Sequence, residues 1–180
     1  VMNPAVSDSA LGSSVRSSPN VTASTVFIGS GAGAVFALDA REGSERWRFE
    51  TGGTVMSSPT AIDDVVYVGS RDGNVYAIDA NEGTERWRFE TGAAVSSSPT
   101  IVDGTCVIGS TDGAVYALGT DDGAERWRYD TDALVRSSPT ISDGTVYVGS
   151  DDENLYALDA ATGEEQWTVA TGNSNMGPTR

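Results

Sequence analysis

The chain has no histidine, no lysine and a single cysteine, Cys106. Without histidine, neither a Ser/His/Asp nor a Cys/His catalytic arrangement can be assembled. Histidine is also the commonest protein ligand for transition metals, so we do not expect a zinc site. A lone cysteine cannot form a disulfide bond within the chain. These absences exclude the familiar nucleophilic hydrolases and a fold that depends on internal disulfides.

Positive charge and long apolar runs are also scarce. The 180 residues include 26 acidic and 11 basic side chains, which gives a net charge of -15. This charge repels nucleic-acid phosphates and anionic lipid surfaces. No apolar run approaches the roughly 20 residues that span a bilayer. We therefore predict neither a nucleic-acid partner nor membrane insertion.

The composition nevertheless predicts a folded chain. Four Trp, six Tyr and four Phe are present, and disordered acidic chains are poor in such residues. All 11 basic residues are arginine. Many carboxylates combined with no lysine fit an adaptation to high salt, because carboxylates hold water and counterions. We interpret the source as a halophile.

A repeat of 40 residues runs through the whole chain. Its four copies align without insertion or deletion, and each carries a Ser-Ser-Pro triplet, a Gly-Ser pair, a turn glycine and a tryptophan. The triplets begin at Ser17, Ser57, Ser97 and Ser137, and the tryptophans are Trp47, Trp87, Trp127 and Trp167. This pattern predicts four copies of one supersecondary unit, each of which buries its faces against its neighbours.

Within one copy the hydrophobic pattern has a period of two, which is typical of β-strands. In the fourth copy we predict strands at 135–141, 145–149, 154–159 and 165–171. Asp143 and Gly144 form the predicted tight turn between the first two strands, since both central positions of such a turn favour positive φ. Four short antiparallel strands in about 40 residues are typical of a propeller blade. The sequence therefore predicts an all-β fold, a β-propeller built from four blades of four strands.

The repeat resembles the quinoprotein-type, or PQQ-like, propeller repeat over about residues 13–172. The hallmark of that family is Ala-x-Asp-x-x-Thr-Gly-x-x-x-Trp, which docks each blade onto its neighbour. The fourth copy matches it fully from Ala157 to Trp167. The first two copies replace only the threonine, and the third has Gly119 for the aspartate and Asp122 for the threonine.

The residue types in this motif suit a structural joint between blades. A tryptophan buries about 150 to 250 Å² and needs an acceptor for its ring N–H. Alanine leaves room for the ring, and glycine permits positive φ and close approach. We therefore predict blade-docking roles for the four tryptophans, for Gly43, Gly83, Gly123 and Gly163, and for Ala37, Ala77, Ala117 and Ala157.

The position just before each Ser-Ser-Pro triplet differs among the copies. It holds Arg16, Met56, Ser96 and Arg136. We expect this segment to line the central channel of the propeller. Variable residues on a repeated scaffold are where a ligand preference would be encoded, so these four are candidate channel-lining residues.

Quinone-dependent dehydrogenases use this kind of propeller, and the resemblance therefore implies a search for their active site. Those enzymes are similar in having an adjacent cysteine pair over the quinone, a tryptophan beneath it, and calcium held by Glu, Asn and Asp. Here Cys106 has no adjacent cysteine, and all four tryptophans belong to the docking motif. The aspartate pairs at 63–64, 121–122 and 151–152 lack the alternating pattern of a calcium loop. We therefore expect no catalytic residue, no quinone cofactor and no metal.

The favoured function is a non-catalytic scaffold for protein-protein interaction, in the cell envelope or secreted. The resemblance to BamB-type lipoproteins implies this role. The alternatives are a fragment or half of a pyrroloquinoline-quinone-dependent dehydrogenase and a sensor domain of a larger protein. The residues leave a cytoplasmic location open.

The repeat also predicts the domain organisation. We expect an N-terminal extension at 1–12, blades at 13–52, 53–92, 93–132 and 133–172, and the start of a further blade or a tail at 173–180. Similar propellers close with seven or eight blades, so four blades make about half a ring. Large apolar end faces are rarely left bare. We therefore predict a homodimer in which two chains pair head to tail into one eight-bladed ring.

Overall fold

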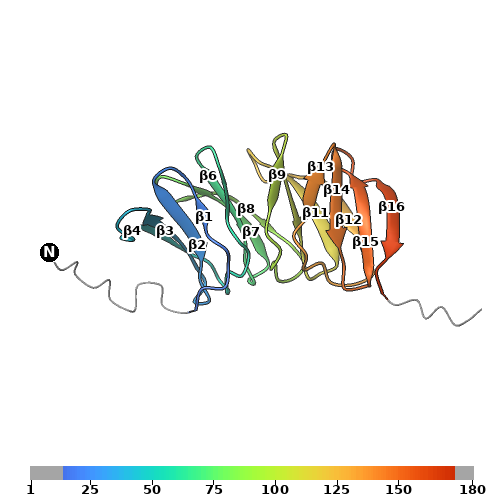
Figure 1. Ribbon diagram of the computed structural model, residues 1–180, viewed down its shortest axis with the longest axis horizontal. Coiled ribbons are helices and arrows are strands. Elements are labelled where there is room, and N and C mark those ends of the chain that lie inside the picture. Colours follow the sequence, from blue (N-terminus) through green and yellow to red (C-terminus); the bar gives the residue numbers. More distant parts are fainter. Residues whose placement is uncertain (1–13, 173–180) are drawn as a thin grey trace, which may run out of the picture.

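The described part of the protein is a partial β-propeller. The computed structural model describes residues 14–172, and every named element in that range is a β-strand. The strands form four antiparallel sheets, one for each copy of the repeat, and the sheets follow one another in chain order (Figure 1). Between residues 14 and 172 no helix is long and apolar enough to cross a membrane. The predicted all-β fold with four-stranded blades is confirmed.

The strand bounds repeat with the sequence. The first blade consists of β1 (Asn20–Val21), β2 (Thr25–Gly29), β3 (Ala34–Asp39) and β4 (Glu45–Glu50). The second consists of β5 (Thr60–Ile62), β6 (Val65–Gly69), β7 (Asn74–Asp79) and β8 (Glu85–Glu90). The third consists of β9 (Thr100–Val102), β10 (Thr105–Gly109), β11 (Ala114–Gly119) and β12 (Glu125–Asp130). The fourth consists of β13 (Thr140–Ser142), β14 (Thr145–Gly149), β15 (Asn154–Asp159) and β16 (Glu165–Ala170).

The first strand of each blade is shorter than the sequence predicts. In the fourth blade we expected a strand over 135–141, whereas β13 begins at Thr140. The backbone N–H of Val135 donates instead to the carbonyl of Ser110 in the preceding blade, at 3.0 Å. Pro139 has no N–H to donate. The segment before β13 therefore joins two blades rather than extending its own sheet.

The rest of this blade follows the prediction closely. The predicted bounds of β14 and β15 are those observed, and β16 ends one residue earlier than expected. Asp143 and Gly144 have φ values of 49° and 73°, which are the left-handed conformations of a two-residue hairpin turn. The predicted turn is confirmed.

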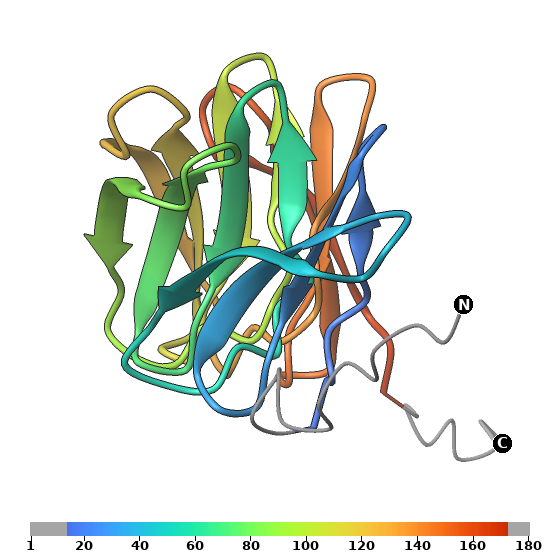
Figure 2. The same ribbon diagram turned by 90° about the vertical axis from the view of Figure 1, so that its left-hand side faces the viewer.

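Consecutive sheets meet at their first strands and diverge toward their fourth. β1 contacts β5, β5 contacts β9 and β9 contacts β13, while no comparable contact joins the described fourth strands. The backbone N–H groups of Ser18, Ser58 and Ser98 each donate to the serine hydroxyl 40 residues later, at 2.8–2.9 Å. We call the first strands and the segments that lead into them the inner wall. Figure 2 shows the molecule from the end formed by the first blade.

The hydrophobic cores lie between sheets. Residues 14–172 contain three clusters of buried side chains, and each combines one face of a blade with the facing side of the next blade. Cys106 belongs to the cluster between the second and third blades and has no exposed surface. Burial raises the pKa of its thiol to about 12, so the thiol is protonated at neutral pH. Cys106 therefore packs as a small core residue.

Candidate functional site

The tryptophan of each of the first three blades contacts the next blade. The indole N–H of Trp47 donates to the carbonyl of Ala80 at 2.9 Å. Trp87 makes the same bond to Thr120 at 2.8 Å, and Trp127 makes it to Ala160 at 3.0 Å. These three rings are only 7–8% exposed. The geometry is that of a repeated joint between blades.

A glycine of the following blade receives each of these rings. At Gly83 a Cβ atom would lie 2.7 Å from the ring of Trp47, and at Gly123 it would lie 2.6 Å from the ring of Trp87. Gly83 also has a φ of 70°, which a residue with a side chain adopts only at a cost. Glycine is therefore required here both by backbone conformation and by ring contact.

The motif alanines lie beside the tryptophans of their own blades. Ala37 is the cross-strand partner of Trp47, and the equivalent pairs recur in the other three blades. A register shift follows the alanine in every blade, between Ala37 and Leu38 in the first. All four alanines are completely buried.

A valine from the segment that links two blades forms a second joint. The backbone N–H of Val55 donates to the carbonyl of Ser30 at 3.0 Å. A Cβ atom at Gly29 would lie 2.4 Å from Val55 Cγ1, so the valine packs directly on the glycine. Gly69 and Gly109 receive the equivalent valines of the next two linkers.

An aspartate and a tyrosine of the following blade hold the same linker. Asp112 Oδ2 accepts hydrogen bonds from the hydroxyl of Tyr116 at 2.6 Å and from the backbone N–H of Gly92 at 2.7 Å. The same arrangement recurs around Asp72 and Asp152. Burial raises the pKa of Asp112, but the hydrogen bonds from Tyr116 and from backbone N–H groups outweigh it and hold the pKa below its usual value. The aspartate is therefore charged at neutral pH.

Asp112→Asn should lower the free energy of unfolding at pH 7 by about 1 to 3 kcal/mol, because the Tyr116 hydroxyl and the Gly92 N–H lose their charged acceptor. The folded pKa lies below the unfolded one, so this contribution is fully present above about pH 4 and is lost as the pH falls through the folded pKa. Urea unfolding at several pH values between about 2 and 7 measures both effects. Asp121→Asn, at an exposed position in a neighbouring turn, is the matched control. Equal losses for the two variants would contradict the assignment.

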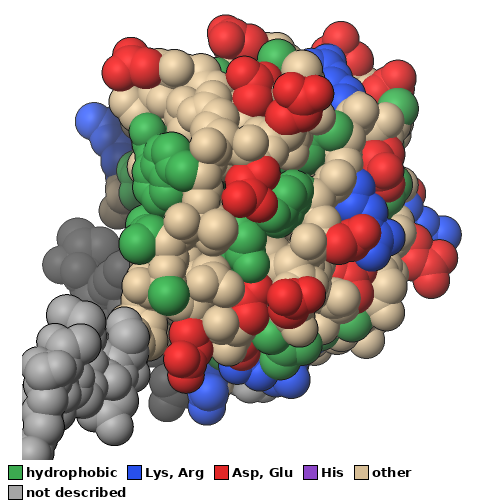
Figure 3. Space-filling model, turned by 90° about the vertical axis from the view of Figure 1, so that its right-hand side faces the viewer, with side chains coloured by type: hydrophobic (Ala, Val, Ile, Leu, Met, Phe, Trp, Pro, Cys, Tyr) green, Lys and Arg blue, Asp and Glu red, His purple; other side chains and the backbone are tan. Residues whose placement is uncertain are grey.

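Each end blade exposes residues that, in the internal joints, are covered by a neighbouring blade. Trp167 is 43% exposed, and its indole N–H has no acceptor among the described residues. The nearest atom to a Cβ at Gly149 is 3.7 Å away and belongs to its own blade. At the other end a Cβ atom at Gly43 would meet nothing within 4 Å, and Val15 is 40% exposed. Figure 3 shows the fourth-blade end, where hydrophobic side chains lie among carboxylates.

The structure brings three of the four candidate channel-lining residues together on the inner wall. Met56, Ser96 and Arg136 line one hollow of about 380 Å³. Arg16 is exposed and is not among its lining residues. The remaining lining residues are Arg71, Ala94, Thr111 and Leu134. We call this hollow the inner-wall hollow.

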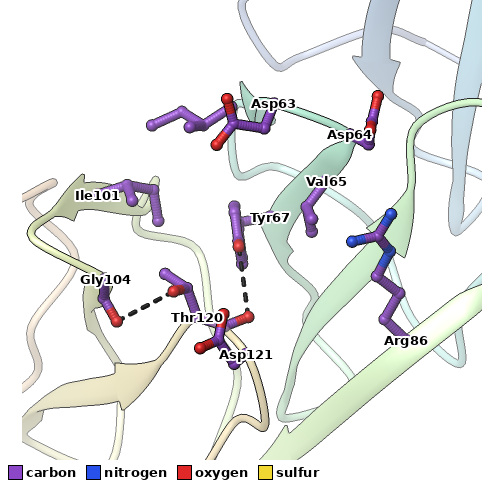
Figure 4. Close-up of a pocket in the computed structure, with 10 residues that line it drawn as sticks. Asp63, Asp64, Val65, Tyr67, Arg86, Ile101, Gly104, Thr120 and Asp121 are labelled. Carbon is purple, nitrogen blue, oxygen red and sulfur yellow. Dashed lines mark hydrogen bonds between the residues drawn. The ribbon is translucent and has the colours of Figure 1, made fainter.

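A second hollow, of about 360 Å³, lies at the joint between the second and third blades, beside the turn that links β5 and β6 (Figure 4). Tyr67 donates its hydroxyl to the carbonyl of Thr120 at 3.4 Å, and Asp63, Asp64 and Arg86 lie around it. A hollow of about 350 Å³ occupies the equivalent place at the next joint. This hollow is therefore a repeated feature of the joints. Within the described range, no three acidic, histidine or cysteine side chains are placed to hold a metal ion.

Comparison with known proteins places this repeat in a family. The model of the family described as outer membrane protein assembly factor BamB matches residues 4–102 and again residues 71–180. The chain belongs to the BamB family. No curated protein matches the chain in sequence.

Solved structures agree with this membership. BamB from Moraxella catarrhalis superimposes with a TM-score of 0.77 at 26% identity, over 87% of this chain and 53% of that protein. A quinohemoprotein alcohol dehydrogenase from Pseudomonas putida has a TM-score of 0.78 at 22% identity, over 89% of this chain and 34% of that enzyme. The computationally designed Ika8 protein has a TM-score of 0.76 at 18% identity, over 84% of this chain and 48% of the design. The last two likenesses are of fold alone, and the chain spans about half of the BamB structure.

Sequence reasoning missed two sets of residues. Arg71 lines the inner-wall hollow and could have been found, because its position also varies among the copies, as Gly31, Arg71, Thr111 and Asp151. The aspartate-tyrosine pairs repeat in three blades and are replaced in the first by Ala32 and Phe36. Their spacing was readable, but their contact with the preceding linker was not.

Proposed function

We propose that this BamB-family chain is a non-catalytic scaffold for protein-protein interaction, located in the cell envelope or outside the cell. We further propose that two copies pair head to tail into an eight-bladed ring. The observation that supports the pairing is the complementarity of the two end faces. Each end exposes the half of a joint that the other end lacks.

The first complementary pair consists of Trp167 and Gly43. In the three internal joints the ring packs on a glycine 36 residues further along the repeat and donates to a carbonyl just before it. In a second copy, Gly43 and the carbonyl of Ala40 stand at those positions. A ring that is 43% exposed would then gain both a surface and an acceptor.

The second pair consists of Val15 and Gly149. Internal linkers place a valine on the equivalent glycine of the preceding blade. Val15 is 40% exposed, and no side chain of a following blade reaches Gly149 within the described range. In each pair one residue lies on the first-blade end and the other on the fourth-blade end, so one head-to-tail contact satisfies both pairs and a two-fold axis repeats it.

The superposition on BamB agrees with this arrangement. The superposition covers 53% of BamB from Moraxella catarrhalis, so two copies of this chain supply about one such propeller. The sequence resemblance implies closure at seven or eight blades, and two copies of four blades supply eight.

A quinone enzyme fits the residues poorly. The quinone sites of similar dehydrogenases need an adjacent cysteine pair and a free tryptophan platform. Cys106 is completely buried in a core, and Trp47, Trp87 and Trp127 are engaged in the joints. We therefore include no quinone and no calcium in the proposal.

Light scattering in about 2 M NaCl, which screens the net charge, tests the pairing. We expect a mass near 37 kDa, twice the 18.7 kDa of one chain. Gly43→Ala should give a folded monomer, because the new methyl group would obstruct Trp167 of the other copy. A compact monomer of the unmodified chain would contradict the pairing.

Gly144→Ala is the matched control for this experiment. Gly144 has a φ of 73° against 68° for Gly43, and at both positions an added Cβ atom would meet nothing within 4 Å. Both variants therefore carry the same backbone strain, but Gly144 lies away from the end faces. The control should keep the mass near 37 kDa, and its dissociation together with Gly43→Ala would show that strain alone opens the pair.

A further inference from the structure

The inner-wall hollow has a charge opposite to that of the whole chain. The protein carries a net charge of -15, yet the ionisable residues that line the hollow are Arg71 and Arg136, without a carboxylate among them. The floor combines apolar side chains, Met56, Ala94 and Leu134, with the hydroxyl groups of Ser96 and Thr111. An acidic protein thus presents a small basic surface at this place.

The hollow is built from departures from the repeat. The scaffold residues keep their identity in all or most copies, whereas the positions of Arg71 and Arg136 hold different residue types in each neighbouring blade. Arg71 comes from the second blade, Ser96 and Thr111 come from the third, and Arg136 comes from the fourth. The blade architecture alone does not require arginine at positions 71 and 136, because the equivalent positions of the neighbouring blades hold other residue types.

The two guanidinium groups have hydrogen-bonding capacity to spare. Arg71 forms no ion pair among the described residues, and its Nη1 atom lies 4.0 Å from the sulfur of Met56. Arg136 uses Nη1 to contact Asp151 Oδ2 at 2.6 Å. Each guanidinium has five N–H donors in a planar fork, so most of them point to solvent or to a ligand.

We propose that the inner-wall hollow binds an organic carboxylate between Arg71 and Arg136. Guanidinium groups match carboxylate geometry and form charge-assisted hydrogen bonds with it. The apolar floor favours an anion with a carbon skeleton over inorganic phosphate. All the lining residues belong to one chain, so the site does not depend on ring closure.

The carboxylate has two sources, an acidic side chain of a bound peptide and a free small carboxylate. The peptide source rests on the scaffold function proposed above, and the free source does not. The hollow has the volume of a small-ligand site, and its arginines are exposed, so either source can reach it.

The test is a titration of the full chain followed by the side-chain Nε–Hε resonances of its arginines. The probes are the blocked peptide Ac-Leu-Glu-Glu-Leu-NH2, its Gln-Gln counterpart, glutarate and inorganic phosphate. We expect the Glu peptide or glutarate to shift Arg71 and Arg136. Arg71→Gln should weaken that binding at least about tenfold, which corresponds to one charge-assisted hydrogen bond.

Arg88→Gln is the matched control, because Arg88 is an exposed arginine on the outer strand β8 and its loss changes the net charge equally. It should weaken binding less than about twofold. Tighter binding of the Glu peptide than of glutarate assigns the site to a peptide, and the reverse assigns it to a free carboxylate. The proposal fails if neither probe shifts the two arginines, if the Gln peptide or phosphate binds equally well, or if both arginine variants weaken binding alike. The mass of the same samples reports ring pairing independently.

Discussion

Trp87→Ala should lower the free energy of unfolding by about 3 to 5 kcal/mol, the range for deleting a large buried aromatic side chain. The ring is 8% exposed, donates to the carbonyl of Thr120 and packs on Gly123. Removing it leaves a cavity between the second and third blades and an unused carbonyl. Urea unfolding in high salt, followed by tryptophan fluorescence and circular dichroism, measures the loss.

Trp167→Ala provides the internal comparison. At dilutions where the chain is monomeric, this variant should lose about 1 to 2 kcal/mol, because a ring that is 43% exposed buries less apolar area than Trp87 does. At concentrations where two copies pair, the loss should rise toward that of Trp87→Ala. Equal losses for both variants in an established monomer would contradict the joint geometry described here.

Gly83→Ala should lower the free energy of unfolding by roughly 2 to 5 kcal/mol. About 1 to 2 kcal/mol comes from placing a Cβ atom at a left-handed φ, and about 1 to 3 kcal/mol comes from overpacking against a core side chain. The new methyl group would lie 2.7 Å from the ring of Trp47, which is held by its own hydrogen bond and cannot move freely.

Gly43→Ala separates the two costs. Its φ of 68° is nearly that of Gly83, at 70°, but no atom lies within 4 Å of its Cβ position. The monomer should therefore lose only the conformational part, about 1 to 2 kcal/mol. Thermal or urea unfolding of both variants measures the difference, and a loss at position 43 as large as that at position 83 would show that ring contact contributes nothing.

Local patterns were sufficient to predict most of the fold. The 40-residue repeat, the period of two and the Asp-Gly turn at 143–144 predicted four blades and the bounds of β14 and β15. These features depend on neighbouring residues, because strand alternation and turn conformation are properties of a few consecutive φ and ψ angles.

The first strands were predicted less well, because their pairing depends on residues that are distant in the sequence. The pattern over 135–141 continues to alternate, but the N–H of Val135 bonds to the preceding blade. The choice between extending a sheet and joining two sheets depends on residues 25 positions away, which no local pattern contains. The same reason explains why the linker contacts of Asp72, Asp112 and Asp152 were not foreseen.

The sequence by itself therefore determined the repeat, the blade and the residue types of each joint. Only the tertiary structure decided which of those joints are occupied and which variable residues meet. Trp87 and Trp167 hold the same position in the docking motif, yet one is buried and the other is 43% exposed, because the fourth blade has no following blade in the described chain. Met56, Ser96 and Arg136 share a hollow with Arg71 because consecutive sheets converge at their first strands. Residues from three blades meet because the sheets pack against one another. The alternation of side chains along a single strand does not predict this packing.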